Sequence, residues 1–196
     1  MGREFELKYR ANAYAVSAIC EKFGGFTPIT MATEYYDTPS RQLSCRHWTL
    51  RRRFENGVSV CTLKTPCPDG GRSEWEVNCP DIREAIDLLC AAGAPITLVG
   101  LTAGGLEQVC AARFTRLAKT LELPGVTLEL ALDRGSLLGG GREEPLCEVE
   151  VELKSGDEQA CVAFAQSLAQ EFSLVPESDS KYARALALAR KEREHG

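Results

Sequence analysis

The stretch "EFELKY", residues Glu4 to Tyr9, alternates strictly between charged and apolar side chains. Its charged side chains share one parity: Glu4, Glu6 and Lys8. A period of two is typical of a β-strand whose two faces meet different surroundings. Glutamate and lysine are depleted in strands, so this charged face needs a reason other than strand propensity.

Five later segments with strand-like alternation also carry polar or charged residues at two-residue spacing. These positions are Arg51 and Arg53 in "LRRRF", Thr62 and Lys64 in "CTLK", Arg72, Glu74 and Glu76 in "RSEWEV", Glu129 and Asp133 in "LELALD", and Glu148, Glu150 and Glu152 in "CEVEVEL". A polar face turned to water explains any one such strand. Six together favour an enclosed charged interior, with the apolar faces pointing outward under a covering layer of helices.

The types of charge indicate what this interior would bind. Neighbours on one strand face lie about 6.7 Å apart, so rows of like charge repel unless a counter-ion joins them. Carboxylate rows without histidine or cysteine favour Mg²⁺ or Mn²⁺ over zinc. Arginine pairs with a lysine beside them suit phosphate oxygens.

The order of elements predicts an α+β fold with an antiparallel sheet, because neighbouring strands are joined by hairpins such as Asn56-Gly57. We expect eight strands: 3–10, 29–37, 47–54, 57–65, 72–79, 113–122, 126–134 and 145–154. We expect helices over 13–23, 81–93, 157–172 and 180–194, with shorter elements at 105–111 (helix) and 136–138 (strand). Eight strands are enough to close into a tunnel. The whole chain, 1–196, is predicted to form one such tunnel domain.

Size and composition limit the other possibilities. The chain has 196 residues and a net charge of -5, which argues weakly against a surface devoted to nucleic acid. We expect no membrane segment and no secretion signal. The nine cysteines are scattered without a C-x-x-C pair, so free thiols in the cytoplasm are expected rather than a disulfide framework or a zinc site.

Several of these segments resemble, in order, the motifs of one family. "EFELK" is similar to the E-x-E-x-K signature of the CYTH superfamily, the triphosphate tunnel metalloenzymes. The other similar blocks are "YYDTP" (35–39), "LRRR" (50–53), "TLK" (62–64), "RSEWE" (72–76), "CEVEVEL" (147–153) and "SKYARA" (180–185). The resemblance implies an eight-stranded antiparallel tunnel and metal-dependent chemistry on a triphosphate.

The resemblance also implies roles for individual residues. The metal ligands would be Glu4, Glu6, Glu148 and Glu150, and the catalytic set would be Glu4, Glu6, Lys8 and Glu150. The triphosphate would be bound by Lys8, Arg51, Arg53, Lys64, Arg116 and Lys181, with Arg113 as a second candidate for the position of Arg116. A second tier of metal ligands, water-orienting groups or ion-pair partners comprises Arg72, Glu74, Glu76, Glu129, Asp133 and Glu152. Tyr35 and Asp37 are expected to be structural.

The wording of the motifs is most similar to bacterial inorganic triphosphatases. The leading hypothesis is therefore hydrolysis of inorganic triphosphate to pyrophosphate and phosphate with Mg²⁺ or Mn²⁺. One alternative is a class IV-type adenylyl cyclase, or a thiamine or nucleoside triphosphatase. Another is a polyphosphate-binding module without catalysis. The expected partner is a small molecule that contains a triphosphate.

Overall fold

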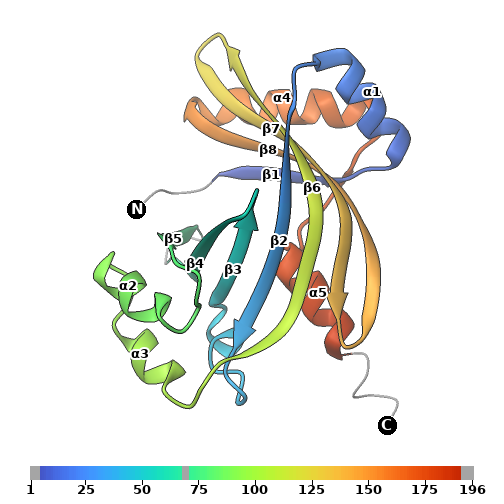
Figure 1. Ribbon diagram of the computed structural model, residues 1–196. Helices are drawn as coiled ribbons and strands as arrows, with labels where there is room; N and C mark the ends of the chain where they lie inside the picture. Colours follow the sequence, from blue (N-terminus) through green and yellow to red (C-terminus); the bar gives the residue numbers. More distant parts are fainter. Residues whose placement is uncertain (1–4, 68–70, 191–196) are drawn as a thin grey trace.

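The computed structural model describes residues 5–67 and 71–190 and is built around one large antiparallel sheet (Figure 1). The strands are β1 (Glu6–Arg10), β2 (Thr27–Asp37), β3 (Thr49–Glu55), β4 (Val58–Pro66), β5 (Arg72–Asn78), β6 (Glu107–Leu123), β7 (Val126–Gly139), β8 (Arg142–Gly156) and β9 (Val175–Pro176). Their order across the sheet is β5-β4-β3-β2-β6-β7-β8-β1-β9. The α+β class and the antiparallel sheet are confirmed.

The prediction of a closed eight-stranded tunnel was wrong, because the described sheet has nine strands and remains open. Closure requires each edge strand to find a partner in register. The edge strand β5 pairs only with β4 in the described part of the chain. At the other edge, β9 pairs with Tyr9 and Arg10 of β1 and covers part of the edge that closure would need. The sheet is therefore a curved trough with a charged interior, and its two edge strands, β5 and β9, are not joined to each other.

The outer face of the β1–β6–β7–β8 half carries a hydrophobic core. Apolar residues of these strands, among them Leu128, Leu130 and Val149, are fully buried. They pack under α1 (Ala13–Phe23) and α4 (Glu158–Glu171), which lie on the same side of the sheet (Figure 1). The apolar parity seen in the sequence thus faces the covering helices, as predicted.

A second core lies under the β3–β4–β5 half. Leu50 and Leu63 of the strands pack against α2 (Ala85–Ala91), and α3 (Thr97–Thr102) adds the fully buried Leu98. A 3₁₀ turn at Ser44–Arg46 precedes β3. The predicted helix at 105–111 was wrong, because residues 107–111 belong to the long strand β6. Glycine and alanine weakened the strand signal there, while pairing with β2 decided the structure.

The last helix, α5 (Lys181–Arg190), lies inside the trough (Figure 1). Ala185, Leu186 and Leu188 pack on apolar side chains of the inner sheet face. The helix approaches β7 so closely that a Cβ atom at Gly139 would lie 2.2 Å from the carbonyl oxygen of Ala185. Since α5 fills one end of the trough, the charged side chains gather at the other end.

Some predicted bounds differ from the structure: the helix expected over 81–93 covers only Ala85–Ala91, the strand expected over 113–122 spans Glu107–Leu123, and α3 was not predicted. Residues 3–4 of the first predicted strand and 191–194 of the last predicted helix lie outside the described residues. The helix at 13–23 is confirmed, with Asn12 as its N-cap: the Asn12 side chain accepts a hydrogen bond from the Ala15 amide. The short strand at 136–138 is the continuation of β7 rather than a separate element. No helix within the described residues is long and apolar enough to cross a membrane.

Candidate active site

A pocket of about 140 Å³ lies on the inner face of the trough, between the β3–β4–β5 half of the sheet and the half that contains β1 and β8. It is at the end of the trough that α5 leaves open. Its charged lining residues are Glu6, Lys8, Arg51, Arg53, Lys64, Arg72, Arg116, Glu150, Glu152 and Lys181. They come from β1, β3, β4, β5, β6, β8 and the start of α5. The alternation of these strands therefore brings charged residues far apart in the sequence to one site, as predicted.

One wall of the pocket is basic. Arg51 and Arg53 stand two residues apart on β3, and Lys64 lies on the neighbouring strand β4. Behind them, Glu74 of β5 lies 3.3 Å from Arg51 Nη2 and 3.1 Å from Lys64 Nζ. Glu76 lies farther away, 3.8 Å from Arg51 Nη2. Glu74 and Glu76 are thus counter-ions of the basic wall, one of the roles proposed for the second tier.

The hydrogen-bonding capacity of the basic wall is not fully used within the described residues. The Nε–H groups of both Arg51 and Arg53 are buried and have no hydrogen-bond partner within the described residues. Burial, and then the nearby charge of Arg51, lower the pKa of Arg53. A buried cation whose charge is disfavoured by a like neighbour gains most from an anionic ligand.

Glu150 lines the opposite wall, and with Asp133 and Glu148 behind it forms a group of three buried carboxylates that we call the carboxylate socket. One carboxylate oxygen from each lies within 4.8 Å of the others. Asp133 of β7 and Glu148 of β8 face each other in the strand register, and Glu150 follows two residues later. Oxygen-rich sites of this kind suit divalent cations such as Mg²⁺.

Three cationic side chains already contact this socket. Lys181 Nζ lies 2.6 Å from Glu150 Oε1, 2.7 Å from Glu148 Oε2 and 2.8 Å from Asp133 Oδ2. Arg116 donates two hydrogen bonds to Asp133, of 2.8 and 2.7 Å, and contacts Glu150. Arg184 donates to Glu148 from the second turn of α5.

The ion pairs in the socket strongly favour the charged forms of its members. Burial alone would raise the pKa of Glu150, but the charges of Lys181 and Arg116 outweigh it and hold that pKa well below its usual range. Burial alone would lower the pKa of Lys181, but Glu150, Asp133 and Glu148 together raise it above its usual range. Both groups are therefore ionised at neutral pH.

A second, more open group of carboxylates lies at the pocket mouth. Glu6 of β1 is paired in register with Glu152 of β8, and Glu152 with Glu129 of β7. Lys154 lies 2.9 Å from Glu152 and 3.7 Å from Glu129. Glu6 and Glu152 line the pocket, whereas the described contacts of Glu129 lead to Lys154 outside it.

The structure separates the predicted residues into three groups. Glu4 lies outside the described residues. The pocket lining includes the predicted Glu6, Lys8, Arg51, Arg53, Lys64, Arg72, Arg116, Glu150, Glu152 and Lys181. The others stand behind the lining: Asp133 and Glu148 in the socket, Glu74 and Glu76 behind the basic wall, and Glu129 beside Lys154.

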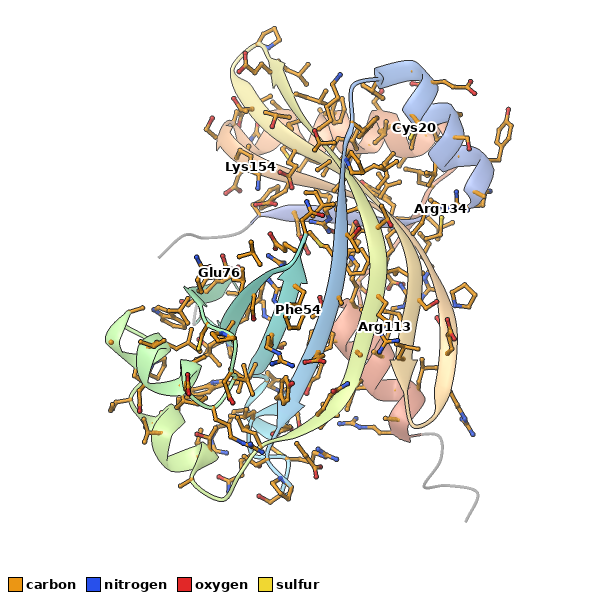
Figure 2. The ribbon with its side chains drawn as sticks, viewed as in Figure 1. Cys20, Phe54, Glu76, Arg113, Arg134 and Lys154 are labelled. Atoms are coloured by element: carbon orange, nitrogen blue, oxygen red, sulfur yellow. The ribbon has the colours of Figure 1, made fainter. Side chains whose placement is uncertain are left out.

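Arg113 and Arg116 point to opposite faces of β6. Arg116 reaches the socket, whereas Arg113, labelled in Figure 2, is exposed. Strand parity forbids both from sharing a face without a bulge between them, and the register between β6 and β7 is continuous there. The pocket assignment therefore belongs to Arg116.

Sequence reasoning missed several pocket residues. Thr33 and Tyr35 line the pocket from β2, in register with Arg53 and Arg51. Their two-residue spacing was a usable signal, although Tyr35 had been expected to be structural. Asp37 does organise the following loop: its carboxylate accepts hydrogen bonds from the backbone amides of Thr38, Leu43 and Ser44. Arg184 was also missed, although it follows Lys181 at a helical spacing of three.

Fold and site together define an α+β protein with a small, charge-lined pocket suited to a polyanion. Comparison with protein families agrees: residues 2–186 match the model of the CYTH domain. The chain therefore belongs to the CYTH domain family, as the sequence motifs indicated.

Individual proteins are also similar to this chain, and the first two share at least a quarter of its residues in the aligned region. An inorganic triphosphatase of Haemophilus influenzae is 29% identical over 164 residues, which are 83% of this chain but 47% of that protein. The chain thus spans about half the length of that curated relative. A solved protein of Pyrococcus horikoshii OT3 is similar with a TM-score of 0.63 at 25% identity, over 94% of this chain and 99% of the other.

A third relative shares the fold alone. A Hippeastrum adenylyl cyclase candidate, described as having a dominant triphosphatase activity, is similar with a TM-score of 0.66. Its identity is 18%, over 96% of each chain. At that identity the comparison shows the arrangement of strands and helices and leaves the reaction open.

Proposed function

We propose that this chain hydrolyses inorganic triphosphate to pyrophosphate and phosphate with the help of a divalent cation. The observation that carries the proposal is the pocket itself, in which the basic wall and the carboxylates line one space of about 140 Å³. Cationic donors bind phosphoryl oxygens, and carboxylates can hold the cation that triphosphate chemistry uses. The similarity to an inorganic triphosphatase of Haemophilus influenzae supports the same substrate.

The basic wall would bind the phosphate chain. Arg51 and Arg53 offer donors in the planar arrangement that matches phosphate oxygens, and Lys64 adds a compact charge beside them. Lys8 lines the pocket from the opposite strand β1. A polyanion between these side chains would be held from two sides, which positions its phosphoanhydride bond for attack.

The carboxylates fit a divalent metal ion in the chemistry of their donors. The lining residues that the structure describes contribute carboxylate oxygens, and no histidine or cysteine, which suits Mg²⁺ or Mn²⁺. Glu148 and Glu150 of the carboxylate socket would hold the ion together with Glu6, with Glu4 before them in the chain. When bound, the ion supplies positive charge to the phosphoryl oxygens.

The attacking water needs a general base or an orienting group. The carboxylates of Glu6 and Glu152 line the pocket from paired positions of β1 and β8, so they can accept a hydrogen bond from such a water. Arg116 stays bound to Asp133 and Glu150, and so fixes the carboxylate that faces the substrate. No covalent intermediate with the protein is required.

Pocket size favours inorganic triphosphate over a nucleotide or thiamine triphosphate. Pockets for organic ligands of drug size have volumes of about 300–1,000 Å³. The apolar lining residues Met31, Tyr35 and Phe114 are each under 10% exposed and pack in the core beneath α5. In the described structure they therefore offer little surface on which a base or a thiamine ring could stack.

One assay separates these functions. Purified protein is incubated with inorganic triphosphate, thiamine triphosphate, ATP or long polyphosphate, each with Mg²⁺, Mn²⁺ or a chelator, and products are quantified. The proposal expects phosphate and pyrophosphate from triphosphate as the fastest reaction, and none with chelator. Cyclic AMP from ATP would identify a cyclase, and tight polyphosphate binding without turnover would identify a binding module.

A pair of variants tests the acidic residues. We expect Glu4→Gln/Glu6→Gln to abolish metal-dependent turnover with an unchanged circular dichroism spectrum. The matched control is Glu122→Gln/Glu143→Gln, which removes the same charge from two exposed strand positions. Full activity in the first variant, or equal loss in both, would contradict the assignment.

A further inference from the structure

We infer that Lys181 is an internal substitute for a divalent cation: its ammonium group fills the carboxylate socket until a metal ion displaces it toward the phosphate pocket. The inference rests on the proposed function and adds to it an order of events. When the metal ion binds in the socket, Lys181 leaves it and moves to the substrate, so the two events occur together.

The contacts of Lys181 are those of a bound cation. Its Nζ atom lies within 2.8 Å of oxygens from Asp133, Glu148 and Glu150, the same three residues whose oxygens gather closely enough to hold a metal ion. The side chain of Lys181 is 10% exposed, so little water shares the ammonium group. The ammonium group of Lys181 and a divalent ion would therefore bind the same carboxylate oxygens, so they compete for one site.

The charge balance explains why the ammonium group is needed. Three carboxylates face three cationic side chains, namely Arg116, Lys181 and Arg184. Without Lys181, two arginines would remain against three buried carboxylates, and an uncompensated buried charge is strongly disfavoured. A divalent ion in place of Lys181 leaves the socket with a net positive charge, which a polyphosphate would then neutralise.

One carboxylate oxygen of the socket contacts Lys181 without forming a well-directed hydrogen bond. Glu148 Oε2 is buried and makes no hydrogen bond of acceptable geometry in the described structure, although Lys181 Nζ lies 2.7 Å away. The contact is thus close but badly directed. An ion coordinates oxygens with less demand on hydrogen direction, so Glu148 gains when a metal replaces the ammonium group.

The displaced side chain has a place to go. Lys181 lines the phosphate pocket as well as the socket, and its Nζ lies 5.4 Å from the centre of the Phe114 ring. In the exchange, the ammonium group would turn from the socket into this pocket by rotation about its own side-chain bonds. Arg184 holds Glu148 throughout, which keeps α5 on β8 during the exchange.

The first experiment measures Mn²⁺ binding by electron paramagnetic resonance without substrate. We expect Lys181→Met to bind Mn²⁺ about tenfold more tightly than the unmodified protein, because the ion no longer competes with a buried charge. The matched control is Lys154→Met, which removes an ammonium group that also contacts two carboxylates but is 40% exposed. It should change the affinity less than about threefold. Adding Asp133→Asn to Lys181→Met should abolish the gain.

The second measurement needs no variant and covers the case in which Lys181→Met does not fold. Acetylation of lysines in the unmodified protein is followed by mass spectrometry with and without Mg²⁺. Lys181 should react several-fold faster with Mg²⁺ present, while Lys154 should not.

The outcomes distinguish this inference from the proposed function. Equal Mn²⁺ affinity in Lys181→Met and the unmodified protein, or unchanged Lys181 labelling with bound Mg²⁺, would overturn the exchange even if triphosphate is hydrolysed. If triphosphate is not hydrolysed with any metal ion, the proposed function fails, whatever the lysine does.

Discussion

The basic wall and the carboxylate socket differ in how closely their charged side chains are already paired within the protein. On the basic wall, Arg53 pairs closely with Glu55, the contacts to Glu74 and Glu76 run from 3.1 to 3.9 Å, and two arginine Nε–H groups lack partners within the described chain. In the carboxylate socket, Lys181 contacts lie between 2.6 and 2.8 Å, and the carboxylates are 0–10% exposed. The basic wall is ready to accept an anion, whereas the socket is already neutralised and must rearrange before it binds a cation.

The largest expected effect comes from the basic wall. Replacing both arginines in Arg51→Ala/Arg53→Ala removes hydrogen bonds to a charged ligand worth about 1.5–3 kcal/mol each. We expect kcat/KM for triphosphate to fall by about a hundredfold or more, mainly through KM. Steady-state kinetics measures this directly.

The control for this variant is Arg113→Ala/Arg134→Ala, which removes two positive charges from exposed positions on the outer face (Figure 2). Its kcat/KM should stay within about twofold of the unmodified value, since exposed charges act weakly over distance. Similar losses in both variants would mean that net charge, rather than the basic wall, governs binding.

We expect substitutions in the carboxylate socket to lower mainly the free energy of unfolding rather than substrate binding. Glu150→Gln leaves Lys181 and Arg116 without a shared carboxylate, and breaking such a buried pair costs about 3–5 kcal/mol. Urea denaturation without metal ions should show this loss. A free energy of unfolding within about 0.5 kcal/mol of the unmodified protein would contradict the buried pairing.

The position of α5 is expected to have a smaller effect. Gly139→Ala would place a Cβ atom against the Ala185 carbonyl, so α5 must shift at a cost of about 1–3 kcal/mol. Because α5 carries Lys181, turnover should fall too. Gly100→Ala is the control, since a Cβ atom there meets nothing within 4 Å. A thermal denaturation midpoint equal to the unmodified one in Gly139→Ala would show that the helix is not packed on β7 as described.

The smallest effect is on the pH dependence of stability. The folded pKa of Glu150 lies below its unfolded value, so its contribution is complete above the unfolded pKa and is lost as pH falls toward the folded one. One proton gives a slope of about 1.4 kcal/mol per pH unit below about pH 4.3. Urea denaturation of metal-free protein should therefore show a shallower acid slope in Glu150→Gln. An unchanged slope would show that Glu150 is not held ionised by its partners.

How much of this could be predicted from sequence depends on the range of the interactions. Alternation is local, so it identified the strands and the inward faces that carry Arg51, Lys64 and Glu150. Closure of the sheet was wrongly predicted because it depends on whether β5 meets β1, which no local pattern encodes. Edge pairing by the short strand β9 decided otherwise.

The socket shows the same limit at the level of side chains. Parity placed Glu148 on the inward face of its strand, where it does lie, and the resemblance to the CYTH motifs implied its role as a metal ligand. Its partners Lys181 and Arg184 come from a helix, whose position inside the trough depends on packing against Gly139 and Leu137. The sequence could therefore place the carboxylates but could not show that a lysine lies among them.

The most direct test of the central claim is phosphate release from inorganic triphosphate by the purified chain. The account predicts turnover with Mg²⁺ or Mn²⁺, none with chelator, and a loss of about a hundredfold or more in kcat/KM in Arg51→Ala/Arg53→Ala but not in Arg113→Ala/Arg134→Ala. No phosphate release with either metal ion would contradict it.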